Sequence, residues 1–327
     1  LNHNGSKLEM CLPTVKNFKV DNTNLSISVE VENSQLCPRY SGVSISGVKI
    51  EKSPEWLENR LKSLGIEPKN NIVDITNFVL HETGQPLHAF DTEKIKGNKV
   101  VVKTLNKKTK FTTLDEVERD LSAEDLMICN DKEAICLAGV FGGLVSGVSD
   151  NTTSVFLESA YFNPVSVRKT AKRHTLSTDS SFRFERGCDP NMTIYALKRA
   201  ALLIKEIAGG EISSEIVDIY PKEIQHFEVE LNYQKLDSLI GEKIGRESVK
   251  SILTDLEIEV VSETENGLSL RVPPFRADVQ REVDVIEEIL RIYGFNTISI
   301  PTKLNTSISY SKDVHPETIR NIVSDLL

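Results

Sequence analysis

The sequence changes character at Pro221, and this change most constrains how the chain can fold. Before Pro221, stretches with the two-residue period of strands alternate with amphipathic helical stretches. After it comes a compact run of a helix over 246–256, strands over 257–261 and 268–272 joined by a turn, and another helix, which resembles a winged helix. A chain of 327 residues also exceeds what one hydrophobic core usually organises. We therefore predict an α+β protein, in which a mixed α/β domain precedes a small winged-helix-like α+β domain.

Local signals place several elements ahead of Pro221. Alternating residues over 18–32, around an Asn-Thr-Asn turn, predict a hairpin. Ser53 is expected to cap a helix that opens with Pro54 and anchors Trp56 in the core. The same reasoning predicts strands over 40–50, 99–104, 126–129 and 154–159, and helices over 74–82, from Asn163, from Asp189 to Ala208, and over 315–327.

Composition narrows the class of protein. The formal charge of -9 argues against a chain that grips nucleic acid over its whole surface, because such contacts require Lys and Arg. Five cysteines without CxxC spacing favour reduced thiols in a cytoplasm and no structural zinc. No apolar run of eighteen residues and no signal peptide is visible, so we expect no membrane association. The start at Leu1 and the final helix that stops at Leu327 suggest a piece of a longer protein.

The stretch GQPLHAFD, residues 84–91, contains one of only six histidines. Pro86 biases Gln85 away from helical angles, so we expect His88 just past a helix end, in the wall of a loop. Loops carry much of the chemistry of enzymes, but a hydrogen-bonded structural imidazole explains His88 as well. Both interpretations stay open at this point.

Two further features could carry chemistry in the first domain. Glu158 stands near the end of an otherwise apolar strand, where a half-buried acid needs a partner or a role. Gly142 and Gly143 allow a ligand to approach the backbone closely or to meet paired amides, although a plain tight turn explains them equally.

Two charged clusters have alternative interpretations. The helix after Asn163 carries Lys169, Lys172 and Arg173, which could contact nucleic acid or could form a solvated face. In the last unit four acids share a surface, which suits Mg²⁺ or is simply a solvated acidic face. These acids are Asp278, Asp284, Glu287 and Glu288.

Six motifs taken together resemble one family. They are GQPLHAFD, VDITNFVLHETG, LAGVFGG, FLESAYF, TDSSFRFERGCDP and FRADVQREVDVIEEILRIYGF. In these motifs and their order the chain resembles the β subunit of bacterial phenylalanyl-tRNA synthetase over nearly its whole length. The resemblance implies a tRNA-editing (B3/B4-type) domain over 37–221 and a winged-helix-like (B5-type) domain over 222–300. It also implies a remnant of a preceding β-rich domain over 1–36 and the truncated start of a catalytic-like domain over 301–327.

The resemblance implies hydrolytic proofreading of tRNA(Phe) that carries tyrosine. A pocket built for phenylalanine rejects tyrosine only about a hundredfold, so a second site is needed. By this resemblance, Glu158 matches the residue that recognises the tyrosine hydroxyl, and Gly142 matches a backbone contact near it. His88 matches the editing-site histidine, and Thr76 matches a threonine that lines the same pocket. Thr178 and Ser180 match two further pocket positions, the second of which is commonly alanine.

The resemblance also implies partners and cofactors. The four acids of the last unit match Mg²⁺ ligands shared with an α subunit, and ATP is used by the whole enzyme on that α subunit. The implied assembly is a cytoplasmic α2β2 heterotetramer that binds tRNA(Phe), with tyrosine or phenylalanine in the editing pocket. The basic helix is then a possible guide for the tRNA acceptor end.

The sequence allows two alternatives to an editing hydrolase to be considered. The chain could be a non-catalytic structural and tRNA-binding module with an inactive editing pocket, for which Ser180 is the sequence hint. A free-standing winged-helix regulator of nucleic acid conflicts with the acidic charge and with the large N-terminal region.

Overall fold

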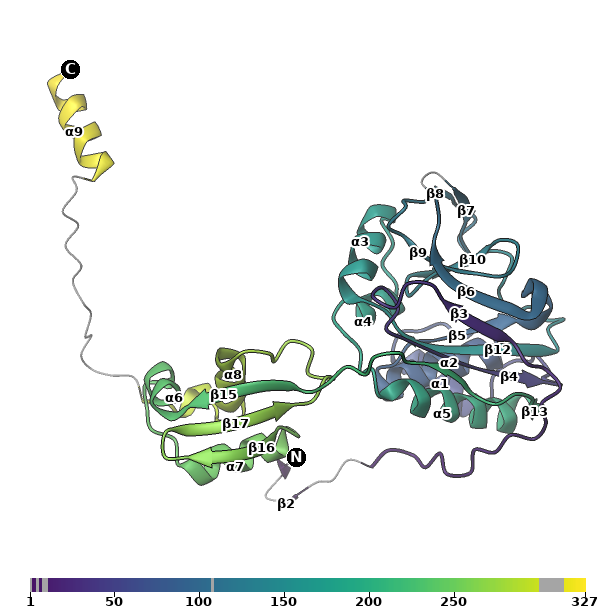
Figure 1. Ribbon diagram of the computed structural model, residues 1–327, viewed down its shortest axis with the longest axis horizontal. Coiled ribbons are helices and arrows are strands. Elements are labelled where there is room, and N and C mark those ends of the chain that lie inside the picture. Colours follow the sequence, from purple (N-terminus) through teal and green to yellow (C-terminus); the bar gives the residue numbers. More distant parts are fainter. Residues whose placement is uncertain (1, 4–5, 8–10, 107–108, 300–314) are drawn as a thin grey trace.

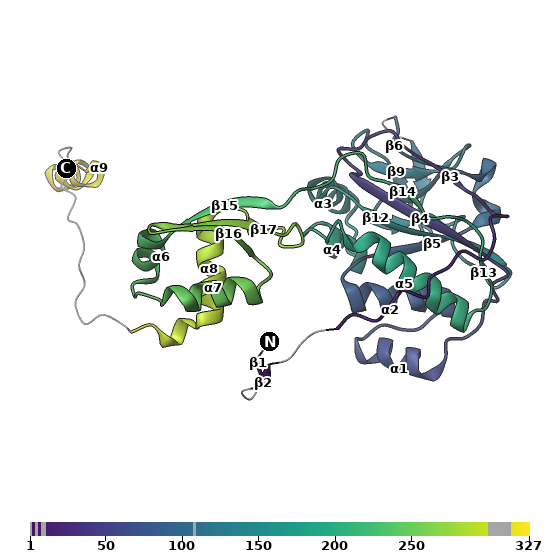
Figure 2. The same ribbon diagram turned by 60° about the horizontal axis from the view of Figure 1, so that its bottom comes forward.

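The computed structural model describes residues 2–3, 6–7, 11–106, 109–299 and 315–327 (Figures 1 and 2). The expected remnant over 1–36 and the expected further domain over 301–327 lie partly outside these residues. The described chain forms a large α+β unit, then a small one, and ends in the helix α9 (Pro316–Leu326), which buries no residue. The strand pairs β1 (Asn2–His3) with β2 (Ser6–Lys7) and β7 (Lys110–Thr112) with β8 (Glu118–Asp120) are short hairpins.

Two sheets stacked on each other form the large unit. The central sheet has the strand order β13-β4-β12-β5, and β14 also pairs with β4. The outer sheet has the order β11-β10-β9-β6-β3. The central strands are β4 (Arg39–Ser46), β5 (Leu87–Asp91), β12 (Ser154–Tyr161), β13 (Glu211–Ile212) and β14 (Val217–Ile219). The outer strands are β3 (Ser28–Val31), β6 (Lys99–Thr104), β9 (Leu126–Cys129), β10 (Ala134–Leu137) and β11 (Phe141–Gly142).

Helices cover the far face of the central sheet and leave its other face to the outer sheet. The covering helices are α1 (Glu55–Ser63), α2 (Asn71–Thr83) and α5 (Met192–Ile207), which lie below the sheets in Figure 1. Helices α3 (Pro164–His174) and α4 (Asp179–Phe184) follow β12, and the short helices η1 (Thr92–Lys94) and η2 (Lys96–Asn98) follow β5. The large unit is therefore a three-layer arrangement of sheet, sheet and helices.

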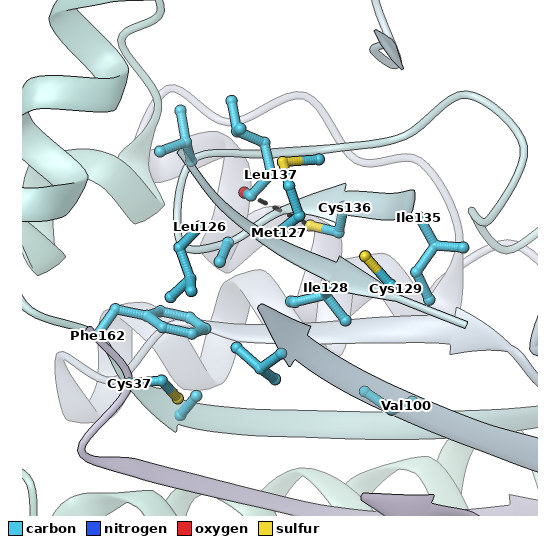
Figure 3. Close-up of a cluster of buried hydrophobic side chains, with 14 of the residues drawn as sticks. Cys37, Val100, Leu126, Met127, Ile128, Cys129, Ile135, Cys136, Leu137 and Phe162 are labelled. Carbon is cyan, nitrogen blue, oxygen red and sulfur yellow. Dashed lines mark hydrogen bonds between the residues drawn. The ribbon is translucent and has the colours of Figure 1, made fainter. Parts of the chain in front are cut away.

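Side-chain alternation along β12 divides the core into two parts. Val155 and Leu157 belong to the core between the central sheet and the helices, whereas Phe156 and Ala160 belong to the core between the two sheets. Glu158 shares its parity with Phe156 and so faces the inter-sheet core. Figure 3 shows part of that core, which includes Cys37 and Cys136. All five cysteines of the chain are free thiols, and Cys11 alone among them is exposed.

The predicted strands and helices of this unit are largely confirmed, but the hairpin over 18–32 is wrong. Only β3 forms, and it pairs in parallel with β6, with Val29 opposite Val100. Its apolar residues pack on the inter-sheet core, whereas Phe18 and Val20 pack on the helix-side core. The apolar residues of this stretch do alternate with polar ones, but its first half packs on the helix-side core and its second half on the inter-sheet core.

The predicted start of α1 is also wrong in two respects. The Ser53 hydroxyl does not cap the helix but donates to Asp74 Oδ2 at 2.6 Å, and Pro54 occupies the N-cap position. Trp56 is 45% exposed and packs edge-on against Phe78, while its neighbour Leu57 is fully buried. Successive helical residues point about 100° apart, and the buried face of α1 is formed by Leu57, Glu58 and Leu61 rather than by Trp56.

The small unit has its own hydrophobic core. A three-stranded antiparallel sheet of order β15-β17-β16 packs against three helices. The predicted order of helix, strand, turn, strand and helix is confirmed as α7, β16, β17 and α8, whereas β15 and α6 were not predicted. The elements are β15 (Phe227–Asn232), α6 (Tyr233–Ile240), α7 (Arg246–Asp255), β16 (Glu259–Thr264), β17 (Gly267–Val272), α8 (Glu282–Tyr293) and η3 (Phe295–Thr297).

Candidate functional site

A cavity of about 720 Å³ opens in the large unit beside the inter-sheet core. Its wall combines side chains from α2, β5, the β10–β11 turn, β12 and the start of α4. All six residues predicted for the editing pocket line this one cavity: Thr76, His88, Gly142, Glu158, Thr178 and Ser180. Segments separated by about a hundred positions in the sequence therefore converge on it.

Glu158 lies on β12 of the central sheet, directly opposite His88 on β5 and Gly42 on β4. Its side chain is buried, with 6% of the residue exposed. Burial raises the pKa of Glu158 to about 7, and a hydrogen bond from Tyr40 acts in the opposite direction. The Tyr40 hydroxyl donates this bond to Oε2 at 2.7 Å. The sequence predicted that this acid needs a partner or a role, and its partner in the fold is the Tyr40 phenol.

His88 lies within β5, so the expectation that it sits in a loop is wrong. The chain after Gly84 enters the central sheet directly, held there by Gln85, whose amide donates to the Ala160 carbonyl at 2.8 Å. The His88 ring stands edge-on to Phe90, and burial lowers the pKa of His88 to about 4. Its Nε2 is shielded from solvent and has no hydrogen-bond partner within the described residues. The imidazole is therefore neutral at pH 7, and its ring lines the cavity.

Gly142 provides room beside His88. A side chain there would place its Cβ 2.8 Å from Leu114 Cδ1 and 3.3 Å from His88 Cε1. The neighbouring amide of Gly143 already donates to the Ile135 carbonyl at 3.0 Å. The pair of glycines therefore does not present two unengaged amides to a ligand, and close approach is the role that the geometry supports.

In the cavity wall, the hydroxyl groups of Thr76, Thr178 and Ser180 all donate to backbone carbonyls. Thr76 donates to Val73 at 2.7 Å, within its own helix. Thr178 caps α4 and donates to Val140 at 2.9 Å, and Ser180 donates to Gly139 at 3.2 Å. What these oxygens offer the cavity is their lone pairs. Together with the Glu158 carboxylate they give the cavity several acceptors, which suit a ligand that brings its own donors.

Sequence reasoning missed two kinds of residue around this cavity. Tyr40 was not selected because it acts on Glu158 from 118 positions away, without lining the cavity itself. Leu114 and Phe182 line the cavity and remain 44% and 49% exposed. Strand alternation could have placed Tyr40 and Val43 on opposite faces of β4. No local sequence signal, however, indicates that Tyr40 bonds to Glu158.

The basic helix is α3, and its three predicted residues differ in their surroundings. Arg173 pairs with the buried Asp125 and with Glu124, so the structure engages it in an ion-pair network. Lys169 and Lys172 are exposed and take part in no ion pair within the described chain. Of the three predicted residues, Lys169 and Lys172 are therefore the two that no ion pair within the described chain engages.

The four acids predicted to bind Mg²⁺ do not come together in this chain. Asp284 pairs with Arg281, and Glu288 lies between Arg276 and Arg291. Asp278 and Glu287 are exposed. Within the described residues, no three metal-ligating side chains gather in a group that could hold an ion. As arranged, these carboxylates do not fit a magnesium site without ligands from elsewhere.

Comparison with known proteins gives two family matches. Residues 36–209 match the B3/4 domain, and residues 229–295 match the tRNA synthetase B5 domain. No helix in the described part of the chain is long and apolar enough to cross a membrane.

Curated relatives extend these matches over almost the whole chain. The phenylalanine-tRNA ligase beta subunit of Bacteroides thetaiotaomicron is 57% identical over 326 residues, which cover 99% of this chain and 40% of that protein. The same subunit of Porphyromonas gingivalis is 51% identical over 314 residues, 96% of this chain and 38% of that protein. The chain thus spans about 40% of the length of these relatives. A crystal structure of an N-terminal fragment of the phenylalanyl-tRNA synthetase beta-subunit from Pyrococcus horikoshii covers 86% of this chain and 77% of that chain, with 16% identity and a TM-score of 0.40.

Proposed function

The chain belongs to the family of phenylalanine-tRNA ligase β subunits, and from this premise we propose that its large unit hydrolyses tyrosine wrongly attached to tRNA(Phe). The substrate is the ester between tyrosine and the terminal ribose. The products are tyrosine and a tRNA with its terminal hydroxyl restored.

The observation that carries this proposal is the Glu158 carboxyl group in the cavity. Its Oε2 accepts the Tyr40 bond, while Oε1 accepts no hydrogen bond within the described residues. A tyrosine hydroxyl can donate to that second oxygen, whereas phenylalanine leaves a buried acceptor unpaired. Such an unpaired group costs about 1 to 3 kcal/mol. The site therefore favours tyrosine, as proofreading requires.

The remaining residues suit the hydrolytic step. A water oxygen attacks the ester carbonyl carbon, the bond to the ribose oxygen breaks, and that oxygen takes a proton. The neutral His88 imidazole lines the cavity and can orient this water by one hydrogen bond from its ring. Thr76 and Thr178 offer acceptors for the ammonium group of the aminoacyl moiety. Positioning of this kind supplies much of the rate for an ester that is already reactive.

The assembly and its cofactors belong to the same proposal. We expect the whole protein to pair with an α subunit as α2β2 in the cytoplasm, with ATP and Mg²⁺ used for aminoacylation. Any Mg²⁺ held by Asp278, Asp284, Glu287 and Glu288 requires further ligands and a rearrangement of their arginine partners. No step proposed for the editing cavity passes through a metal.

The decisive experiment is single-turnover deacylation of Tyr-tRNA(Phe) and Phe-tRNA(Phe) by the complete enzyme. Wild type is expected to hydrolyse the tyrosyl ester preferentially. Glu158→Ala is expected to reduce this preference about tenfold, since it removes the acceptor of the tyrosine hydroxyl. His88→Ala is expected to slow hydrolysis of both esters, because it acts on the water rather than on the side chain.

The matched control for these variants is Glu93→Ala, which removes an exposed glutamate from η1 outside the cavity. It should behave as wild type. Hydrolysis no faster than in the absence of enzyme would reject proofreading and leave the alternative function, a structural and tRNA-binding module with an inactive pocket. Ser180, the sequence hint for that alternative, has its hydroxyl bonded to Gly139.

The two available lysines of α3 support a guiding role for the tRNA acceptor end. Replacing both Lys169 and Lys172 with glutamine in the complete enzyme should reduce the slope of log K against log salt by about 1 to 2. The measurement is tRNA(Phe) binding across a salt series, with Lys222→Gln, an exposed lysine between the two units, as the control. An unchanged slope would show that these two lysines do not contact the phosphates.

A further inference from the structure

We propose that Tyr40 is a positioning residue of the editing cavity, whose hydroxyl clamps one oxygen of the Glu158 carboxylate and thereby reserves the other for the hydroxyl of a tyrosyl ligand. This inference rests on the proposed proofreading function and deepens it. Tyr40 acts through Glu158, because Glu158 lines the cavity and Tyr40 does not.

The geometry of β4 and β12 brings these two side chains together. Gly42 is directly opposite Glu158 in the antiparallel register, and Tyr40 is opposite Ala160. A side chain at Gly42 would meet the Phe156 ring, with its Cβ 2.2 Å from Cζ. The position facing Glu158 is therefore kept empty of a side chain, and the Tyr40 phenol reaches the carboxylate diagonally across the strand pair.

The bond between them is shielded from water. Tyr40 has no exposed surface, and its hydroxyl lies 2.7 Å from Glu158 Oε2. A hydrogen bond to a charged group in such surroundings is short and strong, and it holds the carboxylate in one rotamer. The second carboxylate oxygen then has a defined direction toward the cavity.

Within the described residues, no cation forms an ion pair or hydrogen bond with Glu158, whose carboxyl group is bonded by Tyr40. The groups that face it are the thiols of Cys37 and Cys136, the neutral imidazole of His88 and the phenol of Tyr40. Burial raises the pKa of both thiols, with a further contribution from Glu158. The Tyr40 hydrogen bond is consequently the interaction that favours the ionised, acceptor form of the carboxyl group.

The role of Tyr40 in specificity follows from this chemistry. An ionised carboxylate only accepts hydrogen bonds, so it distinguishes a tyrosine hydroxyl from the bare ring of phenylalanine. Without Tyr40 the carboxyl group holds its proton to higher pH and can rotate. A protonated carboxyl group can donate to nearby carbonyls instead, and its preference for the ligand hydroxyl falls.

The test is the substitution Tyr40→Phe in the complete enzyme, which removes one oxygen and keeps the ring. Single-turnover deacylation of Tyr-tRNA(Phe) and Phe-tRNA(Phe) is measured at several enzyme concentrations and across pH 5.5 to 8.5. The preference for tyrosine is expected to fall about tenfold at pH 7, through weaker binding of the tyrosyl ester rather than a lower maximal rate. The midpoint of the pH dependence of that preference should move to higher pH. The control is Tyr161→Phe, which lies on β12 with Glu158 but outside the cavity lining. It should change neither the preference nor the midpoint.

A double-mutant cycle separates positioning from a general loss of structure. If Tyr40 acts through Glu158, then Tyr40→Phe should have little further effect on preference in the Glu158→Gln background. Equal losses in both backgrounds, or a folded Tyr40→Phe enzyme with wild-type preference and pH profile, would overturn the proposal.

A readout without tRNA keeps this inference distinct from the proposed function. In pH-difference infrared spectra of the complete enzyme, the band of protonated Glu158 is identified by its loss in Glu158→Gln. Tyr40→Phe should raise the pH at which this band disappears, whether or not wild type hydrolyses any ester. An unchanged titration would reject the clamp, whereas absent hydrolysis with a shifted titration would reject only proofreading.

Discussion

Replacing Asp125 with alanine is expected to lower the free energy of unfolding of the large unit by about 3 to 5 kcal/mol. The carboxylate is fully buried before β9 and bonds to Thr170, Arg173 and His174 of α3 and to the amide of Ser122. Burial alone would raise its pKa, but these bonds, His174 foremost, hold the pKa of Asp125 below its ordinary value. Alanine leaves Thr170, His174 and the Ser122 amide without this acceptor and leaves Arg173 with Glu124 alone.

Urea unfolding followed by tryptophan fluorescence measures this effect in the right unit. Trp56 is the one tryptophan in the sequence and lies on α1 of the large unit, so the small unit does not contribute. The matched control is Glu124→Ala, which removes the exposed second partner of the same Arg173. That pair is solvent-exposed, so the control should lose no more than about 1 kcal/mol. Equal losses for the two variants would contradict the importance of the buried network.

The second large effect is the dependence of stability on the ionisation of Glu158. The folded pKa is about 7, above the ordinary value of 4.5. The contribution of this group to stability is therefore fully present below pH 4.5 and is lost as pH rises through about 7. The difference between the two pKa values corresponds to about 3 kcal/mol.

Comparison with Glu158→Gln isolates that contribution. The free energy of unfolding of wild type minus that of the variant should fall by about 3 kcal/mol between pH 4.5 and 8. The same urea titrations at several pH values provide the measurement, and Glu93→Gln should show no such trend. A flat difference would mean that Glu158 is ionised as easily in the fold as in the unfolded chain.

Local signals predicted those elements whose ends are decided by one or two residues. Asn163 accepts from two amides at the start of α3, and Gly84 adopts the left-handed conformation that ends α2. Such caps act within one helical turn, so the sequence contains the whole interaction. The strands β6 and β9 were placed equally well, because a run of buried apolar residues is also a local property.

What the sequence could not predict is which distant segments meet. The parallel pairing of β3 with β6, the bond from Ser53 to Asp74 and the exposure of Trp56 depend on layers that assemble only in the folded chain. The same limit applies to the candidate site. Family motifs indicated its six lining residues, but not that His88 lies in a strand or that a phenol holds Glu158.

The position of β3 has a consequence for anyone who wishes to cut this protein into working parts. The strand ends at Val31, before the first residue of the matched B3/4 domain, yet it forms one border of the outer sheet. A fragment that began at residue 36 would leave the backbone of β6 unpaired along that border and uncover apolar residues beneath it. Bare strand edges invite pairing with other chains. Fragments intended for isolated study should therefore retain the residues from Phe18 onward.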